Sequence, residues 1–133
     1  MGNVHIEEVK MAYIKATDAE LEILRELWQA NAPRAVSEIR SALADKHGWK
    51  ATTVKTLLYN LRDKGAVEEV RRGVYRSVIT EDEVTREASR EFVRKMFEGS
   101  AKKLVASLLD SGELTESELA DLRGRLSKEE GDD

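Results

Sequence analysis

The sequence predicts a mainly α-helical protein with one small β-hairpin, and three observations lead to this fold class. Apolar residues recur at helical spacing along most of the 133-residue chain. Three of the expected helices begin at a capping box, in which a Thr and a Glu three residues later bond to each other's backbone N–H groups. Between residues 66 and 79, helical spacing gives way to β-branched residues on either side of a glycine.

The first helix is expected to begin at Thr17, which forms a capping box with Glu20. Its apolar stripe consists of Leu21, Leu24, Leu27 and Trp28. Asn31 tolerates a left-handed conformation and Pro33 cannot continue a helix, so the segment NAPRA ends it. Residues 1–16 show no clear cap and are treated as an N-terminal extension.

A second and a third helix follow before the β-rich segment. The second carries Val36, Ile39 and Leu43 inward and is expected to stop near Gly48. The third begins near Ala51, and Lys64 and Gly65 supply the expected chemistry at its C-terminus. Its inward stripe follows the i, i+3, i+4, i+7 pattern and consists of Val54, Leu57, Leu58 and Leu61.

The opposite face of the third helix has an unusual composition for a solvated surface. Such a face usually carries many Glu and Lys, whereas this one offers hydroxyls, an amide and a lysine. It consists of Thr52, Thr56, Tyr59 and Asp63, with Lys55 and Asn60 on its flanks. One interpretation is that this face is simply solvated; the other is that it contacts a polar ligand.

Two short runs, 66–70 and 74–79, are expected to form a β-hairpin around the turn RRG. Gly73 can supply the positive φ that a tight hairpin turn needs. Neither run alternates strictly between polar and apolar residues, so this prediction depends on residue type more than on period. Three helices followed by a hairpin is the order of a winged helix-turn-helix domain, which we assign to residues 17–79.

The remainder of the chain is predicted to be helical over residues 80–127 and to end in an acidic tail at residues 128–133. Two further capping boxes open helices here, Thr80 with Glu83 and Thr115 with Glu118. The apolar residues are too many for three short helices to bury alone: Phe92, Val93, Met96, Phe97, Leu104, Val105, Leu108, Leu109, Leu119, Leu122 and Leu126. We therefore predict a dimerisation region, the alternative being that these residues pack back on the first domain.

The charge distribution divides the chain into a basic middle and an acidic C-terminal part. The net charge is −4, yet residues 50–76 contain seven basic and three acidic residues, whereas residues 80–133 contain nine basic and fifteen acidic ones. A basic segment of this kind suits a nucleic-acid backbone. The two parts are therefore expected to have different roles.

Composition and spacing argue against an enzyme, a metalloprotein and a membrane protein. The chain has no cysteine, its two histidines lie far apart, and no nucleophile is paired with a base. No apolar run approaches the roughly 20 residues needed to cross a bilayer, and the N-terminus lacks the features of a signal peptide. We expect a cytoplasmic protein without a cofactor, without a metal and without catalytic activity.

In a winged-helix domain, the polar face of the third helix enters the major groove of double-stranded DNA. Hydroxyls and amides can contact base edges or phosphates there without burying a charge. Lys55 and Arg62 would add phosphate neutralisation, and Tyr59 would lie along the phosphates or cover the edge of the core. The hairpin would reach the adjacent backbone or minor groove through Arg71, Arg72 and Arg76.

The stretch TDAELEILRELW at residues 17–28, followed by TTVKTLLYNLRDKGAV at residues 52–67, resembles the penicillinase and methicillin-resistance repressor family (BlaI/MecI), which includes the copper-responsive CopY repressors. Residues 99–126 are similar to the family's C-terminal region. The resemblance implies a dimeric winged-helix repressor that binds a palindromic operator through its third helix. It also implies that the positions of major-groove contacts are held by Thr52, Thr53 and Thr56.

This chain departs from the family pattern at three places. Family members often carry Ser-Pro where this chain has Lys50-Ala51, which weakens the helix cap and lets the lysine contact a phosphate. The cysteine cluster of CopY members is absent, which excludes that mode of copper sensing. Antibiotic-responsive members are cleaved at an Asn–Phe bond, where this chain has Ser107 and Leu108, so the resemblance gives little support to a membrane sensor-protease as a partner.

The sequence thus predicts a sequence-specific transcriptional repressor that acts as a homodimer on a palindromic operator and blocks polymerase by occupancy. The predicted DNA contacts at the third helix are Lys50, Thr52, Thr53, Lys55, Thr56, Tyr59 and Asn60. The alternative is a winged helix used as a protein-interaction module without sequence-specific DNA binding, which the overall acidity would allow. Steep weakening of binding with salt would distinguish the first from the second.

Overall fold

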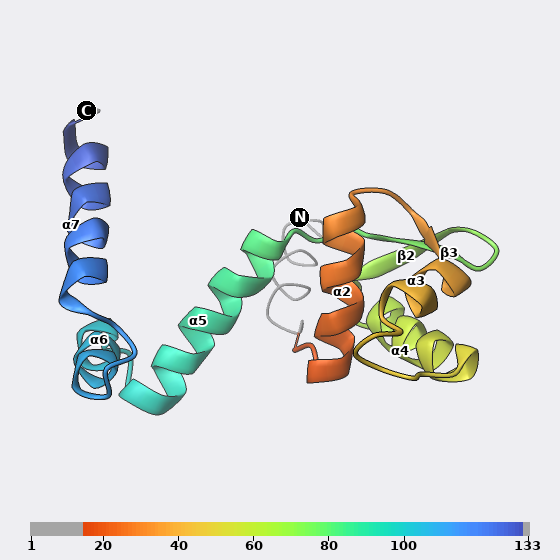
Figure 1. Ribbon diagram of the computed structural model, residues 1–133, viewed down its shortest axis with the longest axis horizontal. Coiled ribbons are helices and arrows are strands. Elements are labelled where there is room, and N and C mark those ends of the chain that lie inside the picture. Colours follow the sequence, from red (N-terminus) through yellow and green to blue (C-terminus); the bar gives the residue numbers. More distant parts are fainter. Residues whose placement is uncertain (1–14, 132–133) are drawn as a thin grey trace, which may run out of the picture. The chain divides into compact units, whose positions relative to one another are not determined.

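The computed structural model describes residues 15–131, and within that range it contains six helices and a three-stranded sheet (Figure 1). Most of the predicted N-terminal extension, residues 1–14, lies outside the described residues, as do residues 132–133 of the predicted acidic tail. The chain forms two compact units that divide between Ala88 and Ser89. The elements in order are α2 (Asp18–Ala30), β1 (Arg34–Ala35), α3 (Val36–Ala42), α4 (Ala51–Asp63), β2 (Val67–Arg71), β3 (Val74–Ser77), α5 (Glu81–Phe97), α6 (Ala101–Asp110) and α7 (Glu116–Gly131).

Helix α2 begins and ends as its sequence predicts. The backbone N–H of Thr17 donates to the Glu20 carboxylate at 2.9 Å, and the Glu20 N–H donates to the Thr17 hydroxyl at 3.2 Å. At the other end Asn31 adopts the left-handed conformation, with φ of 50°. The buried stripe is rotated slightly from the predicted one, because Ile23 is fully buried while Leu21 and Trp28 are only half-buried.

Helix α3 is shorter than predicted. It ends at Ala42, with Leu43 as its C-cap, instead of continuing toward Gly48. Backbone N–H groups of residues 46 and 47 both donate to the Leu43 carbonyl, so the chain turns tightly there. Because Leu43 is itself buried, this turn fixes the end of α3 against the core and starts the loop that leads to α4.

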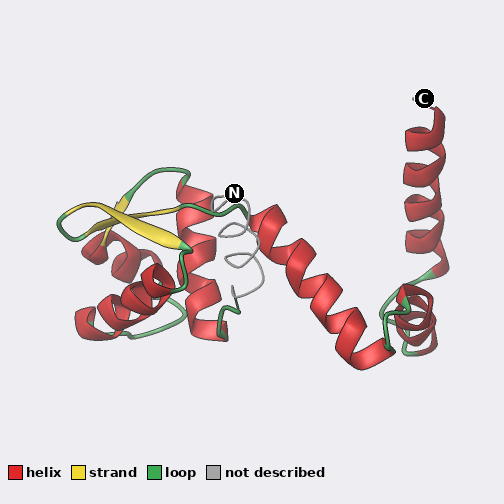
Figure 2. Cartoon of the chain, turned by 180° about the vertical axis from the view of Figure 1, so that it is seen from behind, coloured by secondary structure: helices red, strands yellow, loops and turns green. Residues whose placement is uncertain are grey.

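The sheet contains one strand more than the predicted hairpin. Strand β1 pairs antiparallel with β3, which gives the order β1-β3-β2, with Arg34 opposite Tyr75 and Ala35 opposite Val74. The hairpin itself is confirmed, and Gly73 in its turn has a φ of 73°. The strands lie beside α2, α3 and α4 in the N-terminal unit (Figure 2).

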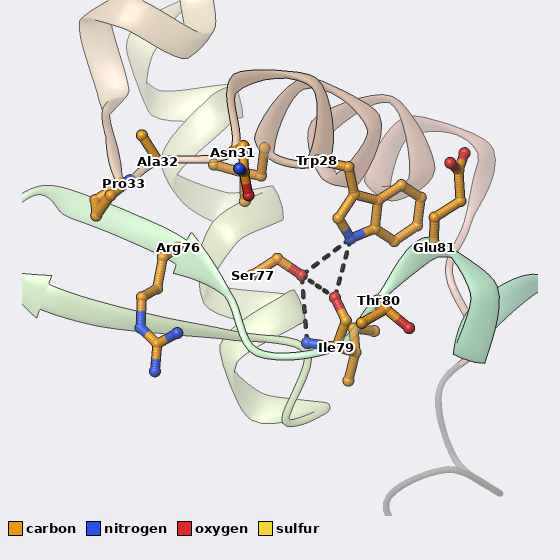
Figure 3. Close-up of a pocket in the computed structure, with 10 residues that line it drawn as sticks. Trp28, Asn31, Ala32, Pro33, Arg76, Ser77, Ile79, Thr80 and Glu81 are labelled. Carbon is orange, nitrogen blue, oxygen red and sulfur yellow. Dashed lines mark hydrogen bonds between the residues drawn. The ribbon is translucent and has the colours of Figure 1, made fainter.

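The core of the N-terminal unit is formed by all three helices and the sheet. Its buried residues are Ile23, Leu24, Leu27, Ile39, Leu43, Val54, Leu58, Leu61, Ala66, Val67, Tyr75 and Ile79. At the edge of this core the indole N–H of Trp28 points to the Ser77 hydroxyl at 3.1 Å and to the Ile79 carbonyl at 3.0 Å (Figure 3). These bonds join the C-terminal half of α2 to the segment between β3 and α5.

The C-terminal helices begin at the predicted caps. Thr80 and Glu83 form a capping box before α5, and Thr115 and Glu118 form another before α7. The break between α5 and α6 contains Gly99, with φ of 85°. Helix α7 continues to Gly131, four residues into the segment 128–133 that the sequence assigns to an acidic tail. The helix persists there because Lys128 and the glutamates that follow have good helix propensity.

No residue of α5 or α6 is buried, although both helices carry many apolar side chains. Met96 is 65% exposed, Phe92 is 49% exposed, and Leu126 on α7 is 61% exposed. The rings of Phe92 and Phe97 contact each other, with centroids 5.8 Å apart. The unit that begins at Ser89 therefore presents apolar surface that a single chain leaves uncovered.

Candidate nucleic-acid interface

Helix α4 has two faces of opposite character. Val54, Leu58 and Leu61 have no exposed surface, and Leu57 is half-buried against the same core. The other face is exposed, and it consists of Thr52, Thr53, Lys55, Thr56, Tyr59 and Asn60. The burial pattern confirms the predicted orientation of the helix. Whether these exposed residues contact DNA stays a prediction at this point.

The loop before α4 is held by two contacts that the sequence did not indicate. The Arg40 Nε donates to the Trp49 carbonyl at 3.0 Å, and the His47 ring stacks on the Trp49 indole with centroids 4.1 Å apart and planes 6° apart. Lys50 follows as the N-cap of α4, with an exposed side chain that makes no capping bond. Arg40 and His47 therefore fix where the exposed face of α4 begins, and only the short spacing of His47 and Trp49 could have suggested this.

A shallow hollow of about 260 Å³ lies on the exposed face of α4, lined by Thr52, Thr53, Thr56 and Leu57. The Thr56 hydroxyl donates to the Thr52 carbonyl, one helical turn earlier, at 3.0 Å. In the chain without DNA this hydroxyl is therefore bonded within the helix, and the predicted contact of Thr56 with DNA stays a prediction.

The C-terminal end of α4 is anchored to the first turn of α2 by a buried ion pair. The Lys64 ammonium group donates to the Glu20 carboxylate and, at 2.8 Å, to the Lys15 carbonyl. Glu20 is 2% exposed. Burial acts to raise the pKa of Glu20, but the bonds from Lys64 and Thr17 outweigh it, so the pKa lies below its ordinary value. The pair ties the helix that carries the polar face to the helix packed behind it.

The hairpin is braced by its acidic residues, which leaves its arginines in different situations. The Glu69 carboxylate accepts from the Gly73 N–H at 2.8 Å and fixes the turn, and it lies 3.7 Å from the Arg62 guanidinium. Arg76 pairs with Glu68, which faces it across the two strands. Arg71 and Arg72 are exposed at the end of β2 and in the turn. In the chain without DNA the Arg76 guanidinium therefore binds a carboxylate, and its predicted contact with DNA stays a prediction.

Two tyrosines, Tyr59 on α4 and Tyr75 in the hairpin, have charged residues near them. The Arg62 guanidinium lies 4.9 Å from the centre of the Tyr59 ring, within range of a cation–π contact. Tyr59 is 42% exposed, so one side of its ring remains accessible. Burial raises the pKa of the Tyr75 hydroxyl, and the nearby Glu69 carboxylate adds to this effect. Tyr75 is thus a neutral core residue in β3, close to the hairpin turn.

A larger hollow of about 370 Å³ lies away from α4, between the end of α2, the end of β3 and the start of α5 (Figure 3). Its polar groups bond mainly with one another: besides the two bonds from Trp28, the Ser77 hydroxyl donates to the Ile79 carbonyl at 2.6 Å. Such a closed set of bonds is typical of a structural joint. Within residues 15–131, no cluster of three metal-ligating side chains occurs, and no helix combines the length and hydrophobicity that crossing a membrane requires.

A three-helix core that exposes one polar helix face, followed by a hairpin with exposed arginines, defines a winged-helix DNA-binding domain. A family model described as "Penicillinase repressor" matches residues 16–128 of this chain. The chain belongs to the penicillinase repressor family, which confirms the resemblance found in its sequence.

Relatives of this chain carry names that agree with the family. The methicillin resistance regulatory proteins MecI of Mammaliicoccus sciuri and of Staphylococcus aureus strain N315 are each 25% identical over 118 residues, which covers 84% of this chain and 93% of the relative. The penicillinase repressor of Bacillus licheniformis is 27% identical over 109 residues, covering 80% of this chain and 84% of the relative. The family consists of transcriptional repressors, which are not enzymes, and this chain is a DNA-binding transcriptional repressor.

Proposed function

We propose that this repressor binds a two-fold symmetric operator as a homodimer, with α4 of each subunit in the major groove of double-stranded DNA. The observation that carries this proposal is the division of α4 into an apolar face packed on the core and an exposed face of threonines, Tyr59 and Asn60. A groove about 12 Å wide admits one such helix. Polar side chains on the outer face then meet base edges, while the leucines hold the helix in place.

The contacts of α4 divide by chemistry. The threonines and Asn60 would meet base edges, because their side chains are short, uncharged and exposed on α4. Lys50 and Lys55 would meet phosphates, which carry the negative charge of the duplex. Tyr59 would lie along the backbone with Arg62 stacked on it. In this arrangement the bases select the sequence and the phosphates fix the register.

We assign the hairpin contacts mainly to Arg71 and Arg72. Both are exposed and lie next to the turn that Glu69 and Gly73 hold in shape. Arg76 is a weaker candidate than the sequence suggested, because its pairing with Glu68 reduces the charge that it offers to a phosphate. The wing would thereby add non-specific affinity at the adjacent backbone or minor groove.

The homodimer would be formed by the apolar surface of the C-terminal helices. Phe92, Met96, Val105, Leu109, Leu122 and Leu126 are exposed in the single chain. So many exposed large apolar side chains on neighbouring helices of the chain are typical of an interaction site, and a second copy would cover them with the same residues. Two-fold symmetry of the dimer matches two-fold symmetry of the operator.

Repression would follow from occupancy of a promoter, which we place in the cytoplasm. A dimer bound over a promoter excludes polymerase without any chemical step. The segment around Ser107 and Leu108 lies in the middle of α6 and has no Asn–Phe bond, so we do not include a membrane sensor-protease among the proposed partners.

The operator can be found by sequencing genomic DNA that the purified protein retains, and the binding constant can then be measured against salt. We expect the logarithm of the binding constant to fall linearly with the logarithm of salt concentration, with a slope of about −0.9 for each phosphate contacted. A random duplex of equal length is the control. Binding that does not depend on salt, or that fails to distinguish operator from control, would contradict the proposal and favour a protein-interaction module.

A further inference from the structure

The hollow on α4 is lined by residues that all carry methyl groups. Three of its four lining residues are threonines, each with a γ-methyl, and the fourth is Leu57. Leu57 is half-buried against the core, so the apolar floor of the hollow is held in place by packing. None of the lining residues is charged. The hollow therefore suits a small apolar group better than a charged phosphate or the polar edge of a base.

Thr56 strengthens this apolar character. Its hydroxyl donates to the Thr52 carbonyl, so donating to an acceptor on a base would require it to give up this bond within the helix. Purines present acceptors in the major groove at N7, and guanine adds O6, so donation from Thr56 to them competes with the bond to the Thr52 carbonyl. Its γ-methyl takes no part in that bond, and Thr56 lines the hollow.

We infer that this hollow receives the C5 methyl group of a pyrimidine in the operator, which in unmodified DNA is a thymine. The inference rests on the proposed function, because it requires α4 to lie in the major groove. The thymine methyl is the only apolar group that the four bases present in that groove, and threonine methyls are among its usual contacts. Each half-site would then contain a thymine opposite the second turn of α4.

Replacement of single thymines by deoxyuridine in the identified operator tests the inference directly, because deoxyuridine pairs identically and lacks only the methyl. We expect one thymine in each half-site to stand out, with about fourfold weaker binding after its replacement, the effect of one buried methyl group. At that position, 5-methylcytosine paired with guanine should bind more tightly than cytosine paired with guanine. The two comparisons separate recognition of the methyl from recognition of the rest of thymine.

Two outcomes would overturn the inference. The first leaves the proposed function intact, and the second overturns the proposed function as well. If the operator is bound specifically but no deoxyuridine replacement weakens binding measurably, the hollow does not recognise a methyl group and the proposed function stands. If no duplex is bound, the proposed function fails as well.

A matched pair of variants locates the contact at Thr56. Thr56→Val keeps a methyl in place and loses the hydroxyl, whereas Thr56→Ser keeps the hydroxyl and its bond to the Thr52 carbonyl but loses the methyl. We expect Thr56→Val to retain the preference for thymine over deoxyuridine and Thr56→Ser to reduce it to less than about twofold. The reverse result, or an unchanged preference in both, would overturn the inference. Because Thr56 is exposed, both variants should fold, and far-UV circular dichroism checks this.

Discussion

The two units of this chain differ in how they dispose of their apolar residues. The N-terminal unit buries Ile23, Leu24, Ile39, Val54, Leu58 and Leu61 completely, whereas α5 and α6 bury no residue at all. Both have capped, well-formed helices, so the difference does not lie in secondary structure. The first unit therefore buries its apolar residues within one chain. The second unit leaves apolar residues exposed, as expected of a region that completes its core with a partner.

The largest effect on stability should come from a substitution in the core of the N-terminal unit. Leu58→Ala should lower the free energy of unfolding by about 2–5 kcal/mol, because Leu58 is fully buried and its removal leaves a cavity. Urea unfolding followed by circular dichroism measures the loss at a fixed protein concentration. Lys55→Ala on the exposed face of the same helix is the control and should change stability by no more than about 0.5 kcal/mol. Equal effects at the two positions would remove the distinction between the faces of α4.

A charge placed in the second unit should act on association instead of on folding of the first unit. Met96→Glu should weaken the dimer by at least about 100-fold, because it would bury an unpaired carboxylate in the interface. Sedimentation equilibrium measures the monomer–dimer constant. Ser117→Glu adds the same charge to α7, away from its leucines, and should leave the constant nearly unchanged. A wild-type chain that is monomeric at high concentration would refute the proposed dimer.

The buried pair of Glu20 and Lys64 predicts a pH dependence that belongs to the first unit alone. Lys64→Met should destabilise by about 2 kcal/mol at neutral pH, less than for a fully buried pair because Lys64 is partly exposed. Since the pKa of Glu20 is lowered by folding, its contribution is complete above its unfolded pKa and disappears as pH falls through its folded pKa.

The free energy of unfolding should therefore be measured in steps from neutral to acidic pH. The difference in this free energy between wild type and Lys64→Met should become smaller as the pH falls. Glu20→Gln, which cannot ionise, serves as the control and should lack this part of the pH dependence. If the difference in free energy of unfolding stays constant down to pH values well below the ordinary pKa of a glutamate, Lys64 acts by packing and not by charge.

The smallest effects are expected on the wing, where the two classes of arginine can be compared. Arg72→Ala should weaken binding to operator and random DNA alike by less than about tenfold and reduce the salt slope by about 1. Arg76→Ala should have a smaller effect, because Arg76 is already paired with Glu68. Fluorescence anisotropy with both duplexes measures these values. Loss of preference for the operator in Arg72→Ala would mean that the wing reads sequence.

What the sequence could predict depended on distance along the chain. The capping boxes at Thr17 and Thr80 involve residues three apart, so local spacing was sufficient. Strand β1 has two residues and pairs with β3 about 40 residues later, so it left no pattern to detect. The same holds for the Glu20–Lys64 pair, whose partners are 44 residues apart.

The exposed face of α4 could be predicted from the sequence, whereas the hydrogen bonds and ion pairs of the residues near it could not. Helical periodicity alone identified this face, because three buried positions and the half-buried Leu57 define the opposite side. The bond of the Thr56 hydroxyl to the Thr52 carbonyl was not predicted, although a threonine within a helix often bonds to the carbonyl four residues earlier. The pairing of Arg76 with Glu68 required the register of two strands, which residue type does not supply.

The strict separation of faces on α4 has an evolutionary consequence. Exchanging the exposed threonines or Asn60 leaves the leucines beneath them untouched, so the cost in stability of a new operator preference is small. Descendants of one such repressor can therefore acquire different target genes through a few substitutions on a single helix, while inheriting the scaffold intact.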